Sequence, residues 1–356
     1  MSGVVRRSER QRASLGFIGI HAGVRGGQAV SQSEILADRF SRDRYPVRQA
    51  STIRNPVLRT LHQLVSILSW RRVDALVIDV FSGRSFRMAE VATGVGRLRG
   101  LRLVLFLHGG NLPEFAPAHR RRVERVFRRA DLILAPSEFL AGTFRRWGHD
   151  VRIIPNLVES DPGPTALRER ARPRVLWMRT FHEHYDPITA VRAFARVAEQ
   201  HPDARMTMGG ADHGLLDATK DAARQLGVAD RISFPGYLDT ESKRTAFAEH
   251  DIFLNTNLVD NMPVSLVEAS GAGLVPVATN VGGIPAVVVD GCNGVLVEPG
   301  DDVSIATAVM ELLEDRERYA AISAGAREFA ASSTWPEVRR RWEEELSLLL
   351  PGSVVR

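Results

Sequence analysis

The sequence is poor in cysteine and has no long apolar run. Cys292 is the only cysteine, which excludes an internal disulfide and disfavours a cysteine-based zinc site. No stretch approaches the ~18–20 apolar residues that are needed to cross a bilayer. The basic start, Met1–Ala13, is not followed by a long apolar segment with a cleavage site. We therefore expect a cytoplasmic protein without a transmembrane helix.

Lysine is also scarce, so arginine supplies most of the positive charge. The chain has 47 basic and 42 acidic residues, and only Lys220 and Lys243 are lysines. This balance permits anionic partners. The stretch from Arg120 to Arg129 is rich in arginine but poor in aromatic side chains on which bases could stack, so we do not expect nucleic acid as a partner. It fits either a solvated basic face or a peripheral contact with the acidic inner face of the cell membrane.

Short runs rich in Val, Ile and Leu alternate with longer amphipathic segments along the chain. Such runs are typical of strands buried on both faces, and their alternation with helices predicts parallel sheets with right-handed crossovers. The predicted strands are Gly16–Ile20, Ala75–Val80, Leu101–Leu107, Leu132–Ala135 and Val151–Ile154, then Arg174–Met178, Arg205–Met208, Arg231–Phe234, Ile252–Asn255, Leu274–Ala278 and Gly294–Val297. The predicted helices are Gln28–Phe40, Pro56–Ser69, His119–Arg129, Ser137–Trp147, Pro187–Glu199, Leu215–Leu226, Glu241–Ala248 and Ile305–Leu313.

The two series of strands predict an α/β protein of two Rossmann-like, doubly wound domains. A segment rich in proline and charge near Val158–Pro173 suggests the boundary. We assign residues 1–158 to the first domain, 159–335 to the second, and 336–356 to a C-terminal helix that packs back toward the first. Ligands of open α/β sheets lie beyond the carboxyl ends of the strands, so we expect the site in a cleft between the two domains.

The segment Asp260–Ala269 carries the strongest chemical signal. Pro263 suits the first turn of a helix, and that helix would aim free backbone N–H groups at the strand ends, where they could bind a diphosphate. Asp260 and Glu268 bracket the turn, and carboxylates placed there can accept hydrogen bonds from sugar and ribose hydroxyls. The same spacing also fits an ordinary capped helix with a solvated Asp and Glu.

Other candidate residues stand at the ends of predicted strands. His108 follows Leu101–Leu107 and precedes two glycines, which fits a residue in the cleft as well as a structural histidine. Arg179 follows Arg174–Met178 and could pair bidentately with a diphosphate. After the first strand, Gly26 and Gly27 open a helix without matching the dinucleotide fingerprint G-x-G-x-x-G.

Metal binding is not expected. The run His182-Glu183-His184 lacks the i, i+4 spacing of a zinc-binding helix, and the sequence offers no evident third ligand. We also predict no cofactor.

Taken in order, these segments resemble glycosyltransferase family 4, also called glycosyl transferases group 1, a retaining family with the GT-B fold. The resemblance runs from about Gly16 to Glu345. Its most specific part is Asp260–Pro285, which is similar to the E-x7-E region of the family followed by its Gly-Gly-x-Pro loop. Ala135-Pro136-Ser137 and Ile154–Leu157 also match.

The resemblance implies a metal-independent hexosyltransferase that takes part in polysaccharide biosynthesis. Its first domain would bind the acceptor, and its second domain would bind the nucleotide sugar. Glu268 would hold the ribose, Asp260 the donor sugar and Arg179 the diphosphate, while His108 would face the sugar. The residues implied to line the donor site are Gly26, Gly27, Gly209, Phe234, Tyr237, Asn261, Met262, Pro263, Val264 and Ser265.

Two departures from the family pattern stand out. Asp260 takes the place of the first motif glutamate. A lysine usually follows the arginine by five or six residues, but His184 and Tyr185 occupy those positions.

Besides sugar transfer to a polysaccharide, lipid-linked or small-molecule acceptor, two alternatives stay open. One is a nucleotide-sugar epimerase or hydrolase of the same fold, and the other a non-catalytic binder of anions or membranes with a decayed donor site.

Overall fold

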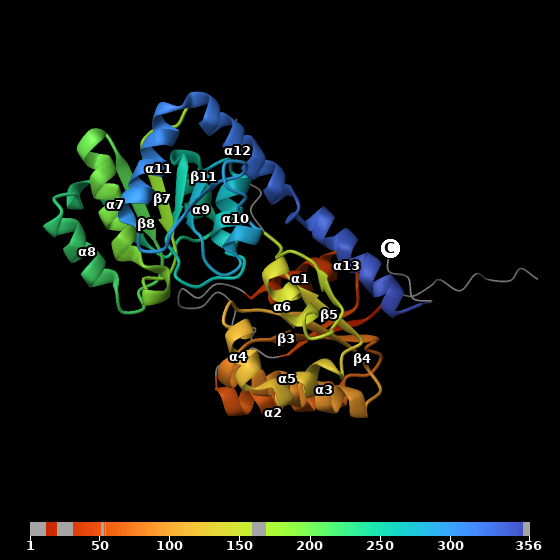
Figure 1. Cartoon of the computed structure of the whole chain (residues 1–356). Coiled ribbons are helices and arrows are strands. Elements are labelled where there is room, and N and C mark those ends of the chain that lie inside the picture. Colours follow the sequence, from red (N-terminus) through yellow and green to blue (C-terminus); the bar gives the residue numbers. More distant parts are fainter. Residues whose placement is uncertain (1–11, 20–30, 51–52, 54, 159–168, 352–356) are drawn as a thin grey trace, which may run out of the picture.

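The computed structural model describes residues 12–19, 31–50, 53, 55–158 and 169–351. They form two parallel six-stranded sheets, one in each domain (Figure 1). This confirms the predicted α/β class with two doubly wound domains. The predicted boundary segment falls largely outside the described residues, as do Gly26 and Gly27.

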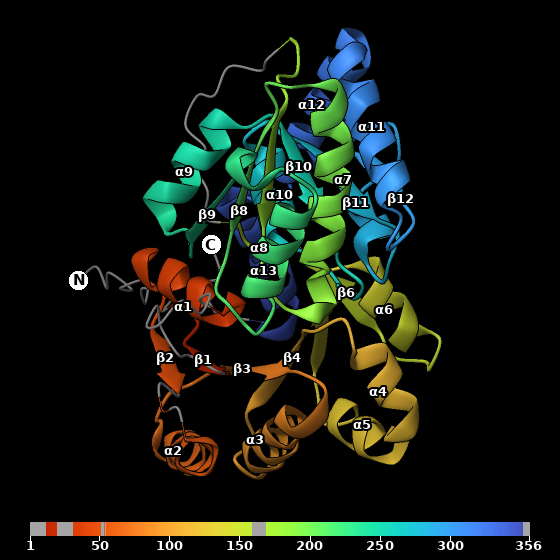
Figure 2. The same ribbon diagram turned by 90° about the vertical axis from the view of Figure 1, so that its left-hand side faces the viewer.

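The N-terminal sheet has the strand order β2-β1-β3-β4-β5-β6. Its strands are β1 (Leu15–Ile18), β2 (Val47–Ala50), β3 (Ala75–Val80), β4 (Arg102–Leu107), β5 (Leu132–Ala135) and β6 (Val151–Ile153). Its helices are α1 (Gln32–Arg42), α2 (Pro56–Ser69), α3 (Phe86–Leu98), α4 (Leu112–Ala118), α5 (Arg120–Phe127) and α6 (Glu138–Arg145). α2, α3 and α5 lie side by side as an outer layer, on the side of the sheet away from α1 (Figures 1 and 2).

The C-terminal sheet has the strand order β12-β11-β10-β7-β8-β9. Its strands are β7 (Arg174–Met178), β8 (Arg205–Gly209), β9 (Ile232–Gly236), β10 (Ile252–Asn255), β11 (Val275–Thr279) and β12 (Val295–Val297). The remaining helices are α7 (Pro187–Gln200), α8 (Leu216–Gln225), α9 (Thr240–Glu249), α10 (Val264–Gly271), α11 (Asp302–Glu314), α12 (Arg316–Ala331) and α13 (Trp335–Leu349).

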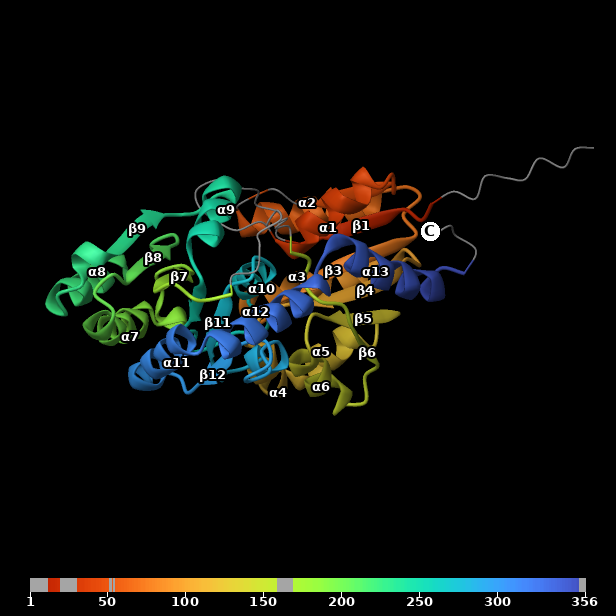
Figure 3. The same cartoon turned by 90° about the horizontal axis from the view of Figure 1, so that it is seen from above.

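The last two helices run from one domain to the other (Figure 3). Ala330 of α12 belongs to the core that α10 forms with the C-terminal sheet. In α13, Trp342 is fully buried against the N-terminal domain, and its ring centroid lies 6.0 Å from that of Phe40 and 5.7 Å from that of Phe106. These buried apolar contacts tie the end of the chain to the first domain.

Some elements were missed by the sequence prediction. β2 is an edge strand in which Arg48 and Gln49 are exposed, so it lacks the apolar run by which the other strands were found. α3 contains Gly94 and Gly96, which disfavour a helix by propensity. A Cβ on Gly96 would lie 2.6 Å from Leu103 of β4, so this glycine lets α3 approach the sheet closely. α4 and α12 were not predicted either.

Candidate functional site

The turn before α10 lies at the carboxyl edge of the C-terminal sheet. β10 ends at Asn255, and α10 begins at Val264 with Pro263 as its N-cap residue. Within the described residues, no side chain caps this helix. Leu266 and Val267 donate their N–H groups to the Pro263 carbonyl, so the N–H groups of Val264 and Ser265 are the ones left for an anion. Pro263 stands one position before the helical turn in which we had predicted it.

The loop after β11 holds this turn by contact between main chains. Gly283 donates its N–H to the carbonyl of Asp260 at 3.0 Å. A Cβ on Gly282 would overlap the carbonyl oxygen of Asp260, and one on Gly283 would overlap that of Asn261. Gly282 also has a φ of +54°, which side chains disfavour. The two glycines are thus required for the loop to press against the turn.

Asp260 is fixed by three groups. Its carboxylate pairs with Arg179 and accepts a hydrogen bond from Asn257 Nδ2 at 2.6 Å and another from the backbone N–H of Asn261 at 2.7 Å. The side chains of Arg179 and Asp260 are only 18% and 16% exposed, so the pair is weakly screened by solvent. The structure therefore brings Arg179, which we predict to bind the diphosphate, into contact with Asp260, which we predict to bind the sugar.

Arg179 is held at the carboxyl end of β7. Its guanidinium carbon lies 4.8 Å from the ring centroid of Tyr185, a cation–π geometry. A Cβ on Gly210, the residue after β8, would overlap the Arg179 carbonyl, so the chain leaving β8 supports the arginine backbone closely. Tyr185 occupies one of the two positions of the missing family lysine, and there it orients the arginine instead of adding a charge.

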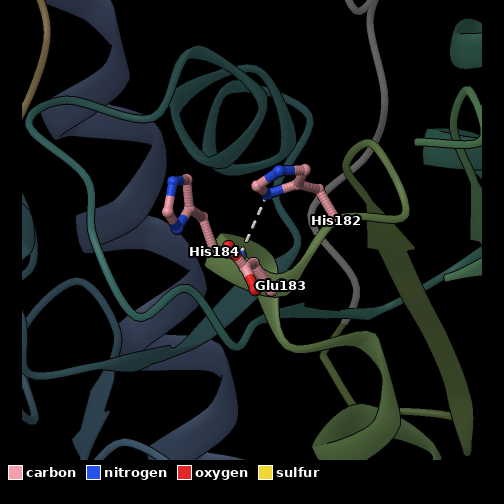
Figure 4. Close-up of side chains that lie close together, drawn as sticks. All are labelled: His182, Glu183 and His184. Atoms are coloured by element: carbon pink, nitrogen blue, oxygen red, sulfur yellow. Dashed lines mark hydrogen bonds between the residues drawn. The ribbon is translucent and has the colours of Figure 1, made fainter. Parts of the chain in front are cut away.

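His184 occupies the other lysine position and lies beside His182 and Glu183 (Figure 4). One possible ligand atom from each of the three side chains lies within 4.8 Å of the others. The Nδ1 atom of His182 accepts the backbone N–H of His184 at 3.2 Å, so only its Nε2 is left for a metal. Glu183 and His184 are exposed. The expectation that the protein uses no metal stays a prediction.

Glu268 lies in α10, and its partner is one of the two lysines. Lys243 Nζ is 2.6 Å from Glu268 Oε1, and Glu268 is only 6% exposed. Asp239 caps α9, the helix that carries Lys243, and accepts the backbone N–H of Ser242 at 2.9 Å. That hydrogen bond holds the pKa of Asp239 below its ordinary value. Sequence reasoning missed Lys243 because nothing in its surroundings links it to Glu268.

His108 is paired with a buried acid that sequence reasoning also missed. Its Nε2 lies 3.0 Å from Oδ1 of Asp79, which is fully buried in β3, and Ser33 donates its hydroxyl to the same oxygen. A carboxylate accepts, so Nε2 is the nitrogen that carries the proton. The Phe81 ring stacks on the imidazole at 5.1 Å. The sequence does carry a signal for Asp79, because it is an isolated acid in an apolar strand. That strand is the neighbour of the strand that His108 follows.

Residues of the N-terminal domain touch the turn directly. A Cβ on Gly110, just after His108, would lie 3.0 Å from the carbonyl carbon of Asp260. Ser137, at the start of α6, donates its hydroxyl to the Asn261 side chain, and the Asn156 amide lies 3.4 Å from the Met262 carbonyl. The carboxyl edges of both sheets therefore meet at residues 260–262.

The remaining predicted residues lie farther along the C-terminal sheet. Gly209 ends β8, and a Cβ there would meet Leu238 at 2.6 Å. Phe234 of β9 packs near Phe181, with ring centroids 6.2 Å apart, whereas Tyr237 is exposed. Their contact with a base stays a prediction.

Several polar atoms at the turn are buried without a hydrogen-bond partner in the described part of the chain. They are Arg179 Nε, Asn257 Oδ1 and Ser265 Oγ. Buried polar groups in folded proteins are nearly always hydrogen-bonded, so their gathering at one place points to a polar ligand there.

Two family models together match most of the chain. Residues 31–162 match the model of glycosyltransferase family 4, and residues 166–329 match that of glycosyl transferases group 1. The chain therefore belongs to the family 4, group 1 glycosyltransferases, as the sequence resemblance predicted. The two parallel sheets described above form the GT-B fold.

Curated relatives are glycosyltransferases. The D-inositol 3-phosphate glycosyltransferase of Corynebacterium kroppenstedtii is 29% identical over 160 residues, which cover 43% of this chain and 36% of that protein. The matched region is thus little more than a third of that relative. The GDP-mannose-dependent alpha-(1-6)-phosphatidylinositol monomannoside mannosyltransferase of Mycolicibacterium smegmatis is 27% identical over 291 residues, 75% of this chain and 76% of that protein.

Solved structures support the fold. The sucrose-phosphate synthase of Thermosynechococcus elongatus superposes with a TM-score of 0.78 at 15% identity, covering 96% of this chain and all of that one. Anabaena HepE, solved in complex with UDP and glucose, superposes with a TM-score of 0.73 at 19% identity, covering 94% of this chain and all of that one. Both likenesses concern the architecture of the two domains.

Replacing Gly283 with alanine should displace the turn, because the new Cβ overlaps the Asn261 carbonyl oxygen. We expect a loss of about 1–3 kcal/mol of stability, measured by chemical denaturation. The matched control is Gly271→Ala at the end of α10, where a Cβ would meet Ala330 at an ordinary 3.5 Å. That variant should be as stable as the wild type or more so. Equal stability of the two variants would contradict this role of the loop.

Replacing Asp79 with asparagine keeps the size of the side chain but removes the carboxylate that orients His108. We expect kcat to fall about 10- to 100-fold. The melting temperature should hold or rise, because the buried Asp79 Oδ2 has no hydrogen-bond partner among the described residues. Asp74→Asn, an exposed position before the same strand, should leave kcat unchanged. A lower melting temperature with normal kcat in Asp79→Asn would show a purely structural role.

Proposed function

We propose that this glycosyltransferase takes its sugar from a nucleotide diphosphate sugar and transfers it with retention to a hydroxyl of a polysaccharide, lipid-linked or small-molecule acceptor. The observation that carries the proposal is the uncapped start of α10 beside Arg179 and Asp260. It joins a helix N-terminus, a guanidinium and a carboxylate at one edge of the sheet. These are the groups that a diphosphate bonded to a sugar needs.

The donor would lie along the turn. The N–H groups of Val264 and Ser265 and the Arg179 guanidinium would bind the diphosphate. Asp260 would accept hydrogen bonds from the sugar, and Glu268 would accept them from the ribose while Lys243 holds its other side. Anabaena HepE was solved with UDP and glucose bound, which supports a nucleotide and a sugar as ligands of this fold.

The acceptor would enter from the N-terminal domain, past His108 and Gly110. The relative from Mycolicibacterium is named for GDP-mannose and a phosphatidylinositol mannoside, and this favours a lipid-linked glycoside among the three acceptor classes. The arginines of α5 would then lie near acidic head groups. A cytoplasmic enzyme at the inner face of the membrane fits this acceptor.

The reaction breaks the bond between the anomeric carbon and the diphosphate oxygen. Negative charge grows on the leaving phosphate as the sugar becomes oxocarbenium-like, and Arg179 and the helix N–H groups face that charge. The acceptor hydroxyl attacks from the same face, and the leaving phosphate takes its proton. Contact between the domains at residues 260–262 would exclude water from the reacting sugar.

Donor binding tests the proposal. Of the UDP-, GDP-, ADP- and dTDP-sugars, at least one should raise the melting temperature of the wild type. Arg179→Met and Glu268→Gln should weaken that binding tenfold or more, because each loses a charged hydrogen bond worth about 1.5–3 kcal/mol. Arg196→Met, which breaks an exposed ion pair with Asp302 far from the turn, is the matched control.

Nucleotide release then separates the alternatives. Release that depends on an added acceptor supports a transferase. Turnover of the donor without acceptor would support the epimerase or hydrolase. If no nucleotide sugar stabilises the protein, and it instead binds anionic polymers in a salt-sensitive way, the non-catalytic binder takes the place of this proposal.

Sugar transfer should continue in EDTA, because the charge on the leaving phosphate meets Arg179 and backbone N–H groups. The measurement compares kcat with and without the chelator. A loss that a divalent cation restores in the wild type, but not in a His182→Ala/His184→Ala variant, would instead assign the histidine pair to a metal.

A further inference from the structure

α2 carries apolar side chains on its outer face as well as on its inner face. Ile67 on the inner side and Trp70 directly after the helix are buried in the core of the N-terminal domain. The outer side chains are between 53% and 69% exposed, and they are Val57, Leu58, Leu61, Val65 and Leu68. A surface helix of a globular protein ordinarily turns polar residues outward. We call these five residues the α2 face.

The α2 face is continuous. At 3.6 residues per turn, its members fall within an arc of about 100° on the helix, opposite the buried side. On the neighbouring helix α3, Val91 and Leu98 are also exposed, at 36% and 89%. Contiguous exposed apolar surface of this kind marks an interaction site, whereas single exposed residues do not.

The surroundings of the α2 face are positively charged. No acidic residue occurs between Asp43 and Asp74, which includes all of α2. α3 and α5 lie in the same outer layer and expose Arg87, Arg121 and Arg125, together with Arg97 and Arg120, which pair with Asp131 and Glu124 (Figures 1 and 2). Their only acids, Glu90 and Glu124, are each in an ion pair within the domain. An apolar stripe beside exposed arginines complements an anionic, amphipathic surface.

We propose that the α2 face and the arginines of α3 and α5 dock the protein on an anionic lipid bilayer. The leucines and valines would enter the boundary of head groups and acyl chains, and the arginines would contact acidic head groups. No helix within the described ranges is long and apolar enough to cross a membrane.

Two other occupants fit less well. A second copy packed symmetrically through α2 would bring the same arginines of both copies close together, where like charges repel. Nucleic acid would meet the arginines, but the α2 face is aliphatic and offers no ring on which a base could stack. Only a bilayer supplies both the acidic groups and the aliphatic phase.

The position of α2 links docking to the site. Gln63, on the inner side of α2, donates to the Gly19 carbonyl at 2.9 Å, directly after β1. In a parallel sheet the carboxyl ends of all strands share one edge, so α2 lies at the same edge as His108. A docked α2 would hold this edge at the membrane, where a lipid-linked acceptor resides. This last step rests on the proposed function; the docking itself does not.

Vesicle sedimentation of the full-length protein tests the docking. The wild type should sediment with mixed phosphatidylcholine and phosphatidylglycerol vesicles much more than with pure phosphatidylcholine. A Leu58→Gln/Leu61→Gln/Val65→Gln variant should bind the mixed vesicles more weakly, by about tenfold or a larger factor. Arg121→Gln/Arg125→Gln should weaken binding most at low salt. The matched control, Leu226→Gln/Val303→Gln/Leu348→Gln, changes exposed residues on other surfaces and should bind like the wild type.

The outcomes separate docking from catalysis. Equal sedimentation of the α2 variant and the wild type would overturn the docking, as would a wild type that does not sediment. A wild-type dimer in gel filtration that the α2 variant converts to monomer, without a change in vesicle binding, would assign the face to a second copy. If the protein binds vesicles but no nucleotide sugar stabilises it, the docking is supported and the proposed function is contradicted.

Discussion

The turn from Asp260 to Pro263 depends on contacts between main chains that leave no room for a Cβ atom. Gly282 and Gly283 press against the carbonyls of Asp260 and Asn261, and Gly110 approaches the same peptide from the other domain. Main-chain contacts of this kind do not relax as flexible side chains do. The turn is therefore fixed before any ligand arrives, and the uncapped start of α10 and the carboxylate of Asp260 are fixed with it.

The charge at this turn is arranged differently from the usual family pattern. Arg179 pairs with Asp260 and stacks on Tyr185, so the only strong cation described at the turn is already partly neutralised. A donor diphosphate would have to share Arg179 with Asp260, and the helix N–H groups would contribute the remaining positive potential. The shorter side chain of Asp260 is consistent with this arrangement, because its own loop also supplies Asn257 and the Asn261 N–H to hold it.

The sequence predicted the fold better than the contacts within the site. Apolar runs revealed the buried strands, and the helix from Pro56 to Ser69 was predicted with its observed bounds. The polar edge strand β2 carried no such signal. The pairs Asp79–His108 and Lys243–Glu268 join residues that are distant in the chain and meet only when neighbouring elements pack. The local pattern marks Asp79 as an isolated acid in an apolar strand, but it gives no sign of Lys243. The motif residues at strand ends were easier to find because parallel strands share one edge.

The same topology explains how the proposed membrane contact of α2 would serve the site. A crossover helix begins near the carboxyl edge of the strand before it and returns along the sheet, so its first turns always lie near the ligand edge. In this protein the crossover after the edge strand β2 is the helix with the exposed apolar stripe. An edge position leaves its outer side uncovered by other helices, and Gln63 fixes its inner side to the end of β1. In the proposed docking, one helix would contact lipid and support the carboxyl edge of the sheet at once, without any change in the core.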